Sequence, residues 1–294
     1  MKRIDTSHLR PFLILTFVIS WGVPGIGLLL AGTVPGFPFS LEMYTPFYYL
    51  AVWGPAIAAL IVIGRTAGAR GVRRHLARLL DWRLGARWWL FALVGIPAMY
   101  FAGALVESLL LGTPDAIEWR DGAWGALLFV FLMRATAGPV EELGWRGFMQ
   151  PLLQRRYSPI TALIVLAIVH TVWHAPAFLI GFASDTHFAT QLSFPAALAR
   201  FGLGIVFITV FMNVAYNATG GRLTSAFLIH WMLNGVYPWE GSADLMTGQV
   251  IVTGVVAAVM LLASTRKWLR PENAATAVVG TASEGFTIAA GESR

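Results

Sequence analysis

Three short groups of polar residues interrupt long apolar stretches and carry side chains that can do acid–base chemistry. The first is Glu141-Glu142, with Arg146 four residues after the second glutamate. In a helix Glu142 and Arg146 share one face and can pair, which leaves Glu141 on another face as a potential base. The pattern predicts one structural carboxylate and one reactive carboxylate. A helix cap stabilised by a salt bridge is the structural alternative.

The other two groups bring imidazole and amide side chains. His170 and His174 are four residues apart, and an Ala-Pro step that should bend the helix follows His174. His230 and Asn234 have the same spacing, and both can donate hydrogen bonds to a developing oxyanion. Packed histidines and interhelical hydrogen bonds are the structural explanation of the same residues.

Together these residues favour hydrolysis by an activated water. The chain has no cysteine and no H-E-x-x-H motif, and the patterns typical of serine and aspartate intramembrane proteases are also missing. A desolvated Glu141 is a stronger base, and His174 can orient the water. His230 and Asn234 can then stabilise the tetrahedral oxyanion. A zinc ion bound by Glu141, His174 and His230 is the competing way to activate water.

The elements that must position these residues are membrane helices. The chain of 294 residues is 57% hydrophobic and 12% charged, against about 45–50% and about 25% in soluble domains. This composition predicts an all-α, polytopic transmembrane bundle whose fourth to seventh spans enclose a catalytic cavity. Eight apolar runs approach the length of about 20 residues that a span needs, the fourth and seventh least clearly. They cover 11–31, 43–64, 88–112, 123–139, 157–182, 194–216, 222–239 and 246–265.

The charge distribution predicts the orientation. Of the 21 Lys and Arg residues, 18 fall on one side of the eight predicted spans, seven of them in 65–87. This bias predicts a multi-pass protein of the inner (plasma) membrane with both termini cytoplasmic. The net charge of +6 is thus a topology signal, and no nucleic-acid partner is expected. The segment 65–87 is either a basic helix on anionic lipid or a plain cytoplasmic loop.

The end of the sequence differs in composition from the rest. Residues 271–294 are small and polar, which is typical of a disordered cytoplasmic tail. The remaining 1–270 are expected to form one transmembrane domain, with its core motifs in 141–234.

The order of the three motifs resembles that of a known family. Glu-Glu-x-x-x-Arg, then a His on the next helix, then His-x-x-x-Asn is similar to the CPBP family. These are the CAAX-processing and bacteriocin-processing (Abi) intramembrane proteases, which include the type II CAAX prenyl endopeptidases. The resemblance covers 141–234 and implies an eight-helix, glutamate-dependent endopeptidase. The catalytic residues that it implies are Glu141, His174, His230 and Asn234, supported by Glu142 and Arg146.

One position departs from the family pattern. The second motif is typically Phe-x-x-x-His, and His170 occupies the Phe position here. This extra imidazole either fills space or adds a metal ligand. No cofactor is expected for the glutamate mechanism, but the family has also been described as metalloproteases, so zinc stays open.

Two other functions stay open beside the endopeptidase. A bacteriocin-immunity or peptide-binding membrane protein would use the polar cluster to bind without turnover, and a transporter would use it to relay protons. Membrane lipids and a peptide or membrane-protein substrate are the expected partners. The 19 Arg against 2 Lys indicate a GC-rich bacterial genome. Because bacteria generally lack prenylated CAAX proteins, another substrate is expected.

Overall fold

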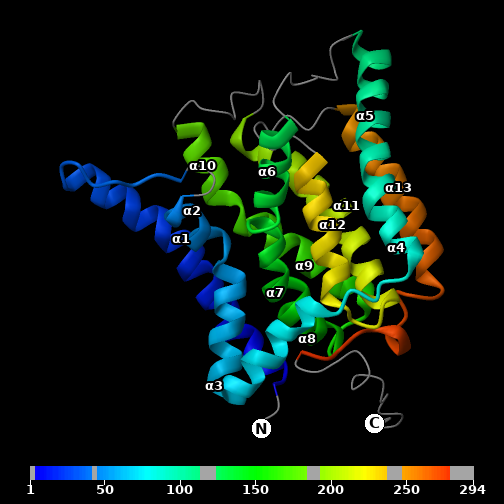
Figure 1. The fold of residues 1–294 in the computed structure, drawn as a ribbon, viewed down its shortest axis with the longest axis horizontal. Coiled ribbons are helices and arrows are strands. Elements are labelled where there is room, and N and C mark those ends of the chain that lie inside the picture. The colour runs from blue at the N-terminus through cyan, green and yellow to red at the C-terminus, as the bar shows by residue number, and fades with distance from the viewer. Residues whose placement is uncertain (1–3, 42–44, 113–123, 184–192, 237–246, 279–294) are drawn as a thin grey trace.

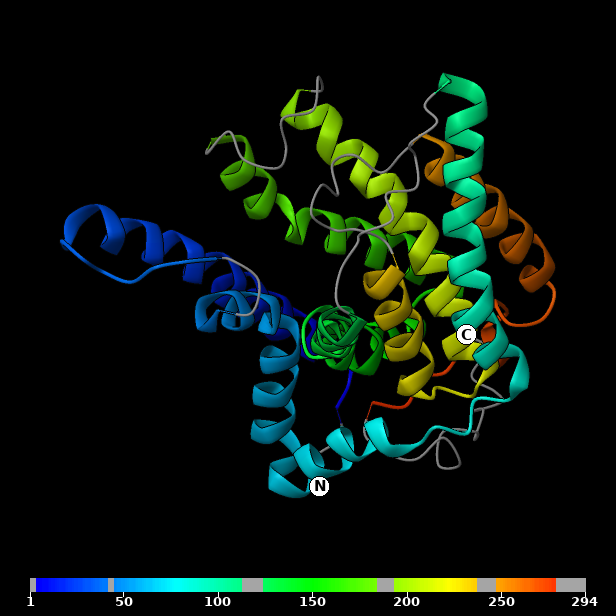
Figure 2. The same cartoon turned by 45° about the horizontal axis from the view of Figure 1, so that its top comes forward.

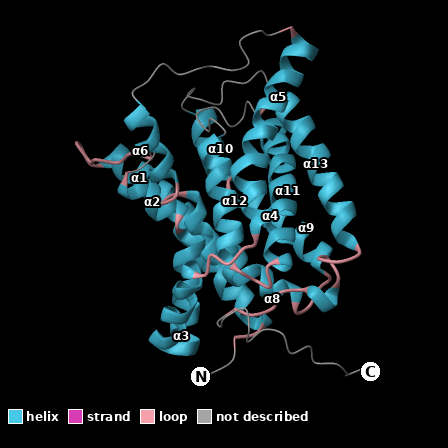
Figure 3. Ribbon diagram, turned by 45° about the vertical axis from the view of Figure 1, so that its right-hand side comes forward, coloured by secondary structure: helices cyan, strands magenta, loops and turns pink. Residues whose placement is uncertain are grey.

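The computed structural model describes residues 4–41, 45–112, 124–183, 193–236 and 247–278. In this part of the chain all regular structure is helical (Figure 3), so the predicted all-α class is confirmed. The helices form a bundle in which α5 and α13 lie side by side and α11 packs against α9, α12 and α13 (Figure 1).

The long helices make up most of the bundle. They are α1 (Leu9–Thr33), α3 (Gly54–Ala77), α5 (Ile96–Leu111), α9 (Pro159–Trp173), α11 (Phe194–Ala218) and α13 (Thr247–Thr265). Shorter helices connect or extend them. These are η1 (Thr6–His8), α2 (Pro46–Val52), η2 (Arg78–Leu80), α4 (Ala86–Leu90), η3 (Phe91–Gly95), α6 (Trp124–Arg134), α10 (Ala175–Ala183), α12 (Leu223–Val236) and η7 (Pro271–Asn273).

Six helical stretches are long and apolar enough to cross a membrane, and five of them coincide with predicted spans. The sixth, Gly54–Leu80, overlaps the predicted span 43–64 only over 54–64 and continues into the segment 65–87, which was predicted to lie outside the spans. In the other two predicted spans, 123–139 and 222–239, the described helices α6 and α12 have 11 and 14 residues. These are shorter than the roughly 20 residues of a simple span. The chain is a multi-pass membrane protein, and the count of eight spans stays a prediction.

The side chains of the outer helices fit a lipid environment. Leu29 of α1, Leu109 of α5 and Leu262 of α13 are 64%, 76% and 72% exposed. An exposed apolar face of this kind is costly in water and costs little among lipid tails.

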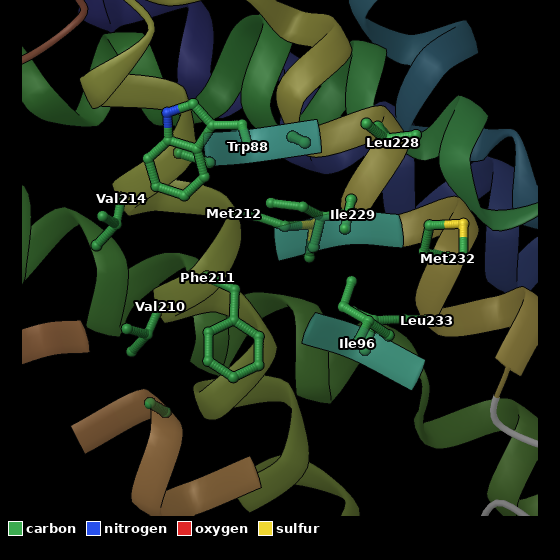
Figure 4. Packing of buried hydrophobic residues seen from close by; sticks show 14 of the residues in the cluster. Trp88, Ile96, Val210, Phe211, Met212, Val214, Leu228, Ile229, Met232 and Leu233 are labelled. Carbon is green, nitrogen blue, oxygen red and sulfur yellow. The ribbon is translucent and has the colours of Figure 1, made fainter. Parts of the chain in front are cut away.

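Two apolar clusters hold the bundle together. The first joins α4 and α5 to α11 and α12 through residues such as Ile96, Phe211 and Leu233 (Figure 4). The second joins α1 and α3 to the segment after residue 144, and includes Phe12 and Trp145. A short, irregular stretch that carries the first polar motif contributes residues to the second cluster.

We call this stretch the motif segment. It runs through η4 (Gly138–Glu141), α7 (Glu142–Gly144), η5 (Trp145–Met149) and α8 (Gln150–Gln154). Figure 2 shows it in green, close to end-on, between α3 in blue and α12 in yellow, both of which contact it. Every residue from 141 to 150 is buried.

Two glycines let α3 approach the motif segment closely. A Cβ at Gly144 would lie 2.4 Å from the carbonyl oxygen of Pro55, and one at Gly147 would lie 2.9 Å from Cε1 of His75. Small residues at such contacts allow helix backbones to come together. The first polar motif is therefore fixed against α3 by the absence of side chains at these two positions.

The end of the described chain corrects one prediction. Residues 271–278 were expected within a disordered tail over 271–294, but they pack against the bundle, and Val278 is 2% exposed. Arg155 donates hydrogen bonds to the carbonyls of both Ile4 and Thr276, so the first and last described segments meet at one end of the bundle (Figure 1). Residues 279–294 lie outside the described residues.

Candidate active site

The motif segment turns the chain in a way that separates its two glutamates. Pro139 lies in the first turn of the 3₁₀ helix η4, where its missing N–H breaks no helical hydrogen bond. Glu141 ends this turn, and Glu142 begins the short helix α7. A π turn over Trp145–Met149 follows, a feature that often marks functional sites. The two carboxylates consequently enter different surroundings.

Glu142 is the centre of a closed ionic network. Nη1 of Arg146 donates to both carboxylate oxygens of Glu142 at 3.1 Å, and Nδ1 of His230 lies 2.7 Å from Oε1. Arg146 also donates to Asn213 Oδ1 and Thr209 Oγ1 of α11, at 3.4 Å and 3.3 Å. The Glu142–Arg146 pair that the spacing predicted is therefore present. The contact with His230 was not predicted.

Glu141 has far fewer partners. It is 3% exposed, and Oε2 accepts a hydrogen bond from Trp145 Nε1 at 3.2 Å. His170 Nε2 is 3.3 Å from the same oxygen, without the alignment of a hydrogen bond. Glu141, His170 and His174 each offer an oxygen or nitrogen within 4.8 Å of the others. The predicted pairing of Glu141 with His174 in space is thus observed, and His170 joins them.

The helix break after His174 follows the prediction. Helix α9 ends at Trp173 and α10 begins at Ala175, so His174 lies at the junction. Its ring stacks on that of His170, with centroids 5.2 Å apart, and contacts Phe201 edge-on at 4.7 Å. His170 is 1% exposed, whereas His174 is only partly buried. Of the two imidazoles, His174 is therefore the one that a substrate can reach.

The two hydrogen-bond donors from α12 converge on one point. A Cβ at Gly138 would lie 2.6 Å from Nδ2 of Asn234 and 2.7 Å from Nε2 of His230. Only a glycine leaves this volume free, three residues before Glu141. This role of Gly138 was not predicted from the sequence. The Gly-Pro step before the glutamates was the available signal.

The structure thus brings the predicted residues into two adjacent groups. Glu141, His170 and His174 form one, and the Glu142 network with His230 and Asn234 forms the other. The group that can hold a metal contains His170 in place of the expected His230. The catalytic roles of these residues stay predictions.

Comparisons with known proteins bear on the same region. Residues 123–236 match the family model described as "Type II CAAX prenyl endopeptidase Rce1-like". This part of the chain is therefore similar to the CPBP family that the motifs resemble. A curated relative, CAAX prenyl protease 2 of Methanococcus maripaludis, is 28% identical over 153 residues, which cover 47% of this chain and 53% of the relative. The chain therefore spans about half the length of the curated relative that it matches.

The family match encloses the whole candidate site. It runs from just before α6 to the end of α12 and includes both glutamates, the histidines and Asn234. Helices α1 to α5 and α13 lie outside it. They contribute the surfaces against which the motif segment packs.

Proposed function

We propose that this protein is an intramembrane endopeptidase that hydrolyses a peptide bond with a water activated by Glu141 and His174. The single observation that carries the proposal is the contrast between the two glutamates. Glu142 is held by Arg146 and His230, whereas Glu141 has one weak donor, Trp145, and faces two imidazoles. A buried carboxylate with few donors is a strong base.

The proposed reaction starts with proton transfer. Glu141 takes a proton from the water as the water oxygen attacks the carbonyl carbon of the peptide bond, and His174 orients that water. The carbonyl oxygen becomes an oxyanion and accepts hydrogen bonds from His230 and Asn234. The C–N bond then breaks, and the proton on Glu141 passes to the leaving amine. The products are a carboxylic acid and an amine, and Glu141 is a carboxylate again.

The contact between His230 and Glu142 sets a condition for this oxyanion site. An ionised carboxylate only accepts hydrogen bonds, so Nδ1 of His230 donates to Glu142. Nε2 of His230, which faces Gly138, then donates only when the ring is an imidazolium. The contact with Glu142 fixes the orientation of the His230 ring. We therefore assign Glu142 the role of orienting His230.

The substrate class follows from chemistry and from the name of the relative. A short peptide that ends in a prenylated Cys-a-a-X sequence is the first substrate to test, because the curated relative is called a CAAX prenyl protease. The same peptide without its prenyl group is the matched control. Cleavage of both peptides would place specificity in the peptide itself, in line with the expectation of a substrate without prenylation.

The test compares the wild-type chain with Glu141→Gln, both purified in detergent. The wild type should cleave at least one peptide, and Glu141→Gln should bind that peptide without cleaving it. Binding without turnover in both proteins would favour the immunity or peptide-binding function. Full activity in Glu141→Gln would contradict the glutamate mechanism.

A zinc-dependent variant of the same reaction has one specific observation in its favour. Two imidazoles and one carboxylate form a donor set typical of catalytic zinc, and both ring nitrogens of His170 lack a hydrogen-bond partner among the described residues. Glu141, His170 and His174 would hold the ion, which would lower the pKa of a bound water. Metal analysis of the purified protein, together with His170→Phe, tests this variant.

A further inference from the structure

Residues 271–278, which we call the C-terminal strap, are bound to the bundle through their backbone. Asn217 accepts a hydrogen bond from the amide of Ala275 at 3.2 Å, and Gln154 donates to the carbonyl of Ala275 at 2.9 Å. Arg155 donates to the carbonyl of Thr276 at 2.9 Å. In Figure 1 the orange-red chain after α13 crosses the lower end of the bundle toward α3. The strap therefore contacts both the motif segment and α11.

The strap ends in the apolar cluster beneath the motif segment. The side chain of Val278 is 2% exposed and belongs to the cluster that includes Ile63 and Phe148. Its carbonyl oxygen faces two buried cationic or potentially cationic side chains. Nδ1 of His75 is 3.1 Å away, and Nη1 of Arg78 donates to it at 2.9 Å.

The same two side chains hold the motif segment. Nε2 of His75 is 3.0 Å from the carbonyl oxygen of Leu143, and Nη1 of Arg78 donates to the carbonyl oxygen of Gly147 at 2.8 Å. Leu143 and Gly147 immediately follow Glu142 and Arg146 in the chain. Each of the two side chains thus bridges the strap and the backbone that carries the first polar motif.

His75 is a specific kind of bridge. Both of its ring nitrogens face carbonyl oxygens, and a neutral imidazole has only one N–H to donate. The strap and the motif segment therefore compete for one proton when His75 is neutral, and both are satisfied when it is charged. Arg78 supports the arrangement from a second side, since Nη2 donates to the hydroxyl of Tyr216 at 2.8 Å.

From these contacts we infer that the strap positions the Glu141–Arg146 stretch for catalysis, with His75 and Arg78 as the positioning residues. The inference rests on the proposed function where activity is concerned. The inference also states that docking of the strap orders the motif segment. This part does not depend on any reaction. Neither His75 nor Arg78 touches the reacting atoms, so both act through the backbone of the motif segment.

The first test undocks the strap without changing the site. Val278→Asp places a charge in the apolar cluster, and Ala277→Asp adds the same charge at a half-buried neighbour as the control. Val278→Asp should speed amide hydrogen exchange in both 275–278 and 142–149. It should lower kcat about 10-fold or more with KM nearly unchanged, because a small misplacement of catalytic groups is costly. Ala277→Asp should do neither.

Val278→Ala, which removes only two methyl groups, replaces Val278→Asp if the charged variant does not accumulate. The second test is a cycle of Val278→Ala with the combined variant His75→Ala/Arg78→Ala. If the strap acts through these two residues, adding Val278→Ala should lower kcat no further than the combined variant does. Additive losses would overturn the assigned route.

The outcomes separate the inference from the proposed function. If Val278→Asp speeds amide exchange in 275–278 but leaves it unchanged in 142–149, the inference that the strap orders the motif segment is wrong, whatever the activity. If the wild type cleaves no peptide, the amide exchange rate of residues 142–149 in the same variants still shows whether the strap orders the motif segment. In that case the proposed function fails and the strap is tested alone.

Discussion

Glu141 and Glu142 are neighbours in the chain and are 3% and 0% exposed, yet their surroundings differ. Glu142 is bound by Arg146 and by His230, and Arg146 in turn is tied to α11. Glu141 has a hydrogen bond from Trp145 and lies beside two imidazoles. A carboxylate that accepts three hydrogen bonds, as Glu142 does, supports structure, whereas one with few donors keeps its basicity for chemistry. The difference leads us to propose a structural role for Glu142 and a reactive role for Glu141.

The largest expected effect is on the reactive member of the pair. Glu141→Gln keeps the size of the side chain and removes the base, so peptide cleavage should fall by about 10²–10⁴-fold with binding largely kept. Stability should change little, because no cation depends on Glu141 alone. Cleavage assays beside thermal unfolding in detergent measure both. A large loss of stability would show that Glu141 is structural as well.

The matched change on the structural member should act on folding. Glu142→Gln leaves the fully buried Arg146 without its counter-charge, so the free energy of unfolding should fall by about 3–5 kcal/mol. Thermal or denaturant unfolding measures this loss. Replacing both partners, as Glu142→Leu with Arg146→Met, should recover much of it. A Glu142→Gln protein as stable as the wild type would remove the proposed division of roles.

The third change tests the space beside Gly138 on which the side chains of His230 and Asn234 converge. Gly138→Ala puts a methyl group within 3 Å of the donors of His230 and Asn234, so cleavage should fall by about 10²-fold as the donors are displaced. Asn234→Ala should cost about 10²–10³-fold. Gly25→Ala is the control, because nothing lies within 4 Å of the added methyl group. Unchanged cleavage in Gly138→Ala would place the oxyanion elsewhere.

The smallest effect is expected at His170. His170→Phe restores the residue typical of the family, and cleavage should change by less than about 10-fold if His170 fills space beside Trp145 and His174. If zinc is bound, the same change should remove both metal and activity. Metal content per chain, measured in both proteins, distinguishes the two results.

Local patterns predicted the local part of the site. The spacing of Glu142 and Arg146 predicted their pair, and the Ala-Pro step predicted the end of α9 at His174. The contact of Glu142 with His230 joins residues 88 apart in sequence. Spacing rules relate only residues within a few turns of one helix, so the Glu142–His230 contact could be found only from the fold. Gly138 was missed for the same reason, because its importance lies in what α12 brings against it.

The predictions for 65–87 and 271–294 missed buried residues because they rested on composition. His75 and Arg78 lie in a run of arginines that predicts either a basic helix on lipid or a plain loop, but both are buried, at 0% and 8% exposure. The strap is small and polar in sequence, which is typical of disorder. It is held mainly by hydrogen bonds to its backbone carbonyls, and side-chain composition does not predict such bonds. Burial of 271–278 was therefore not predictable from its own residues.

The long reach of the strap has a consequence for how the molecule is made. His75 and Val278 are 203 residues apart, one of the longest separations among the described contacts. Contacts between distant parts of a chain form late, because much loop-closure entropy opposes them. During synthesis the motif segment leaves the ribosome long before residue 278 exists. The frame around the two glutamates therefore closes only after the helices that carry the site residues have been made.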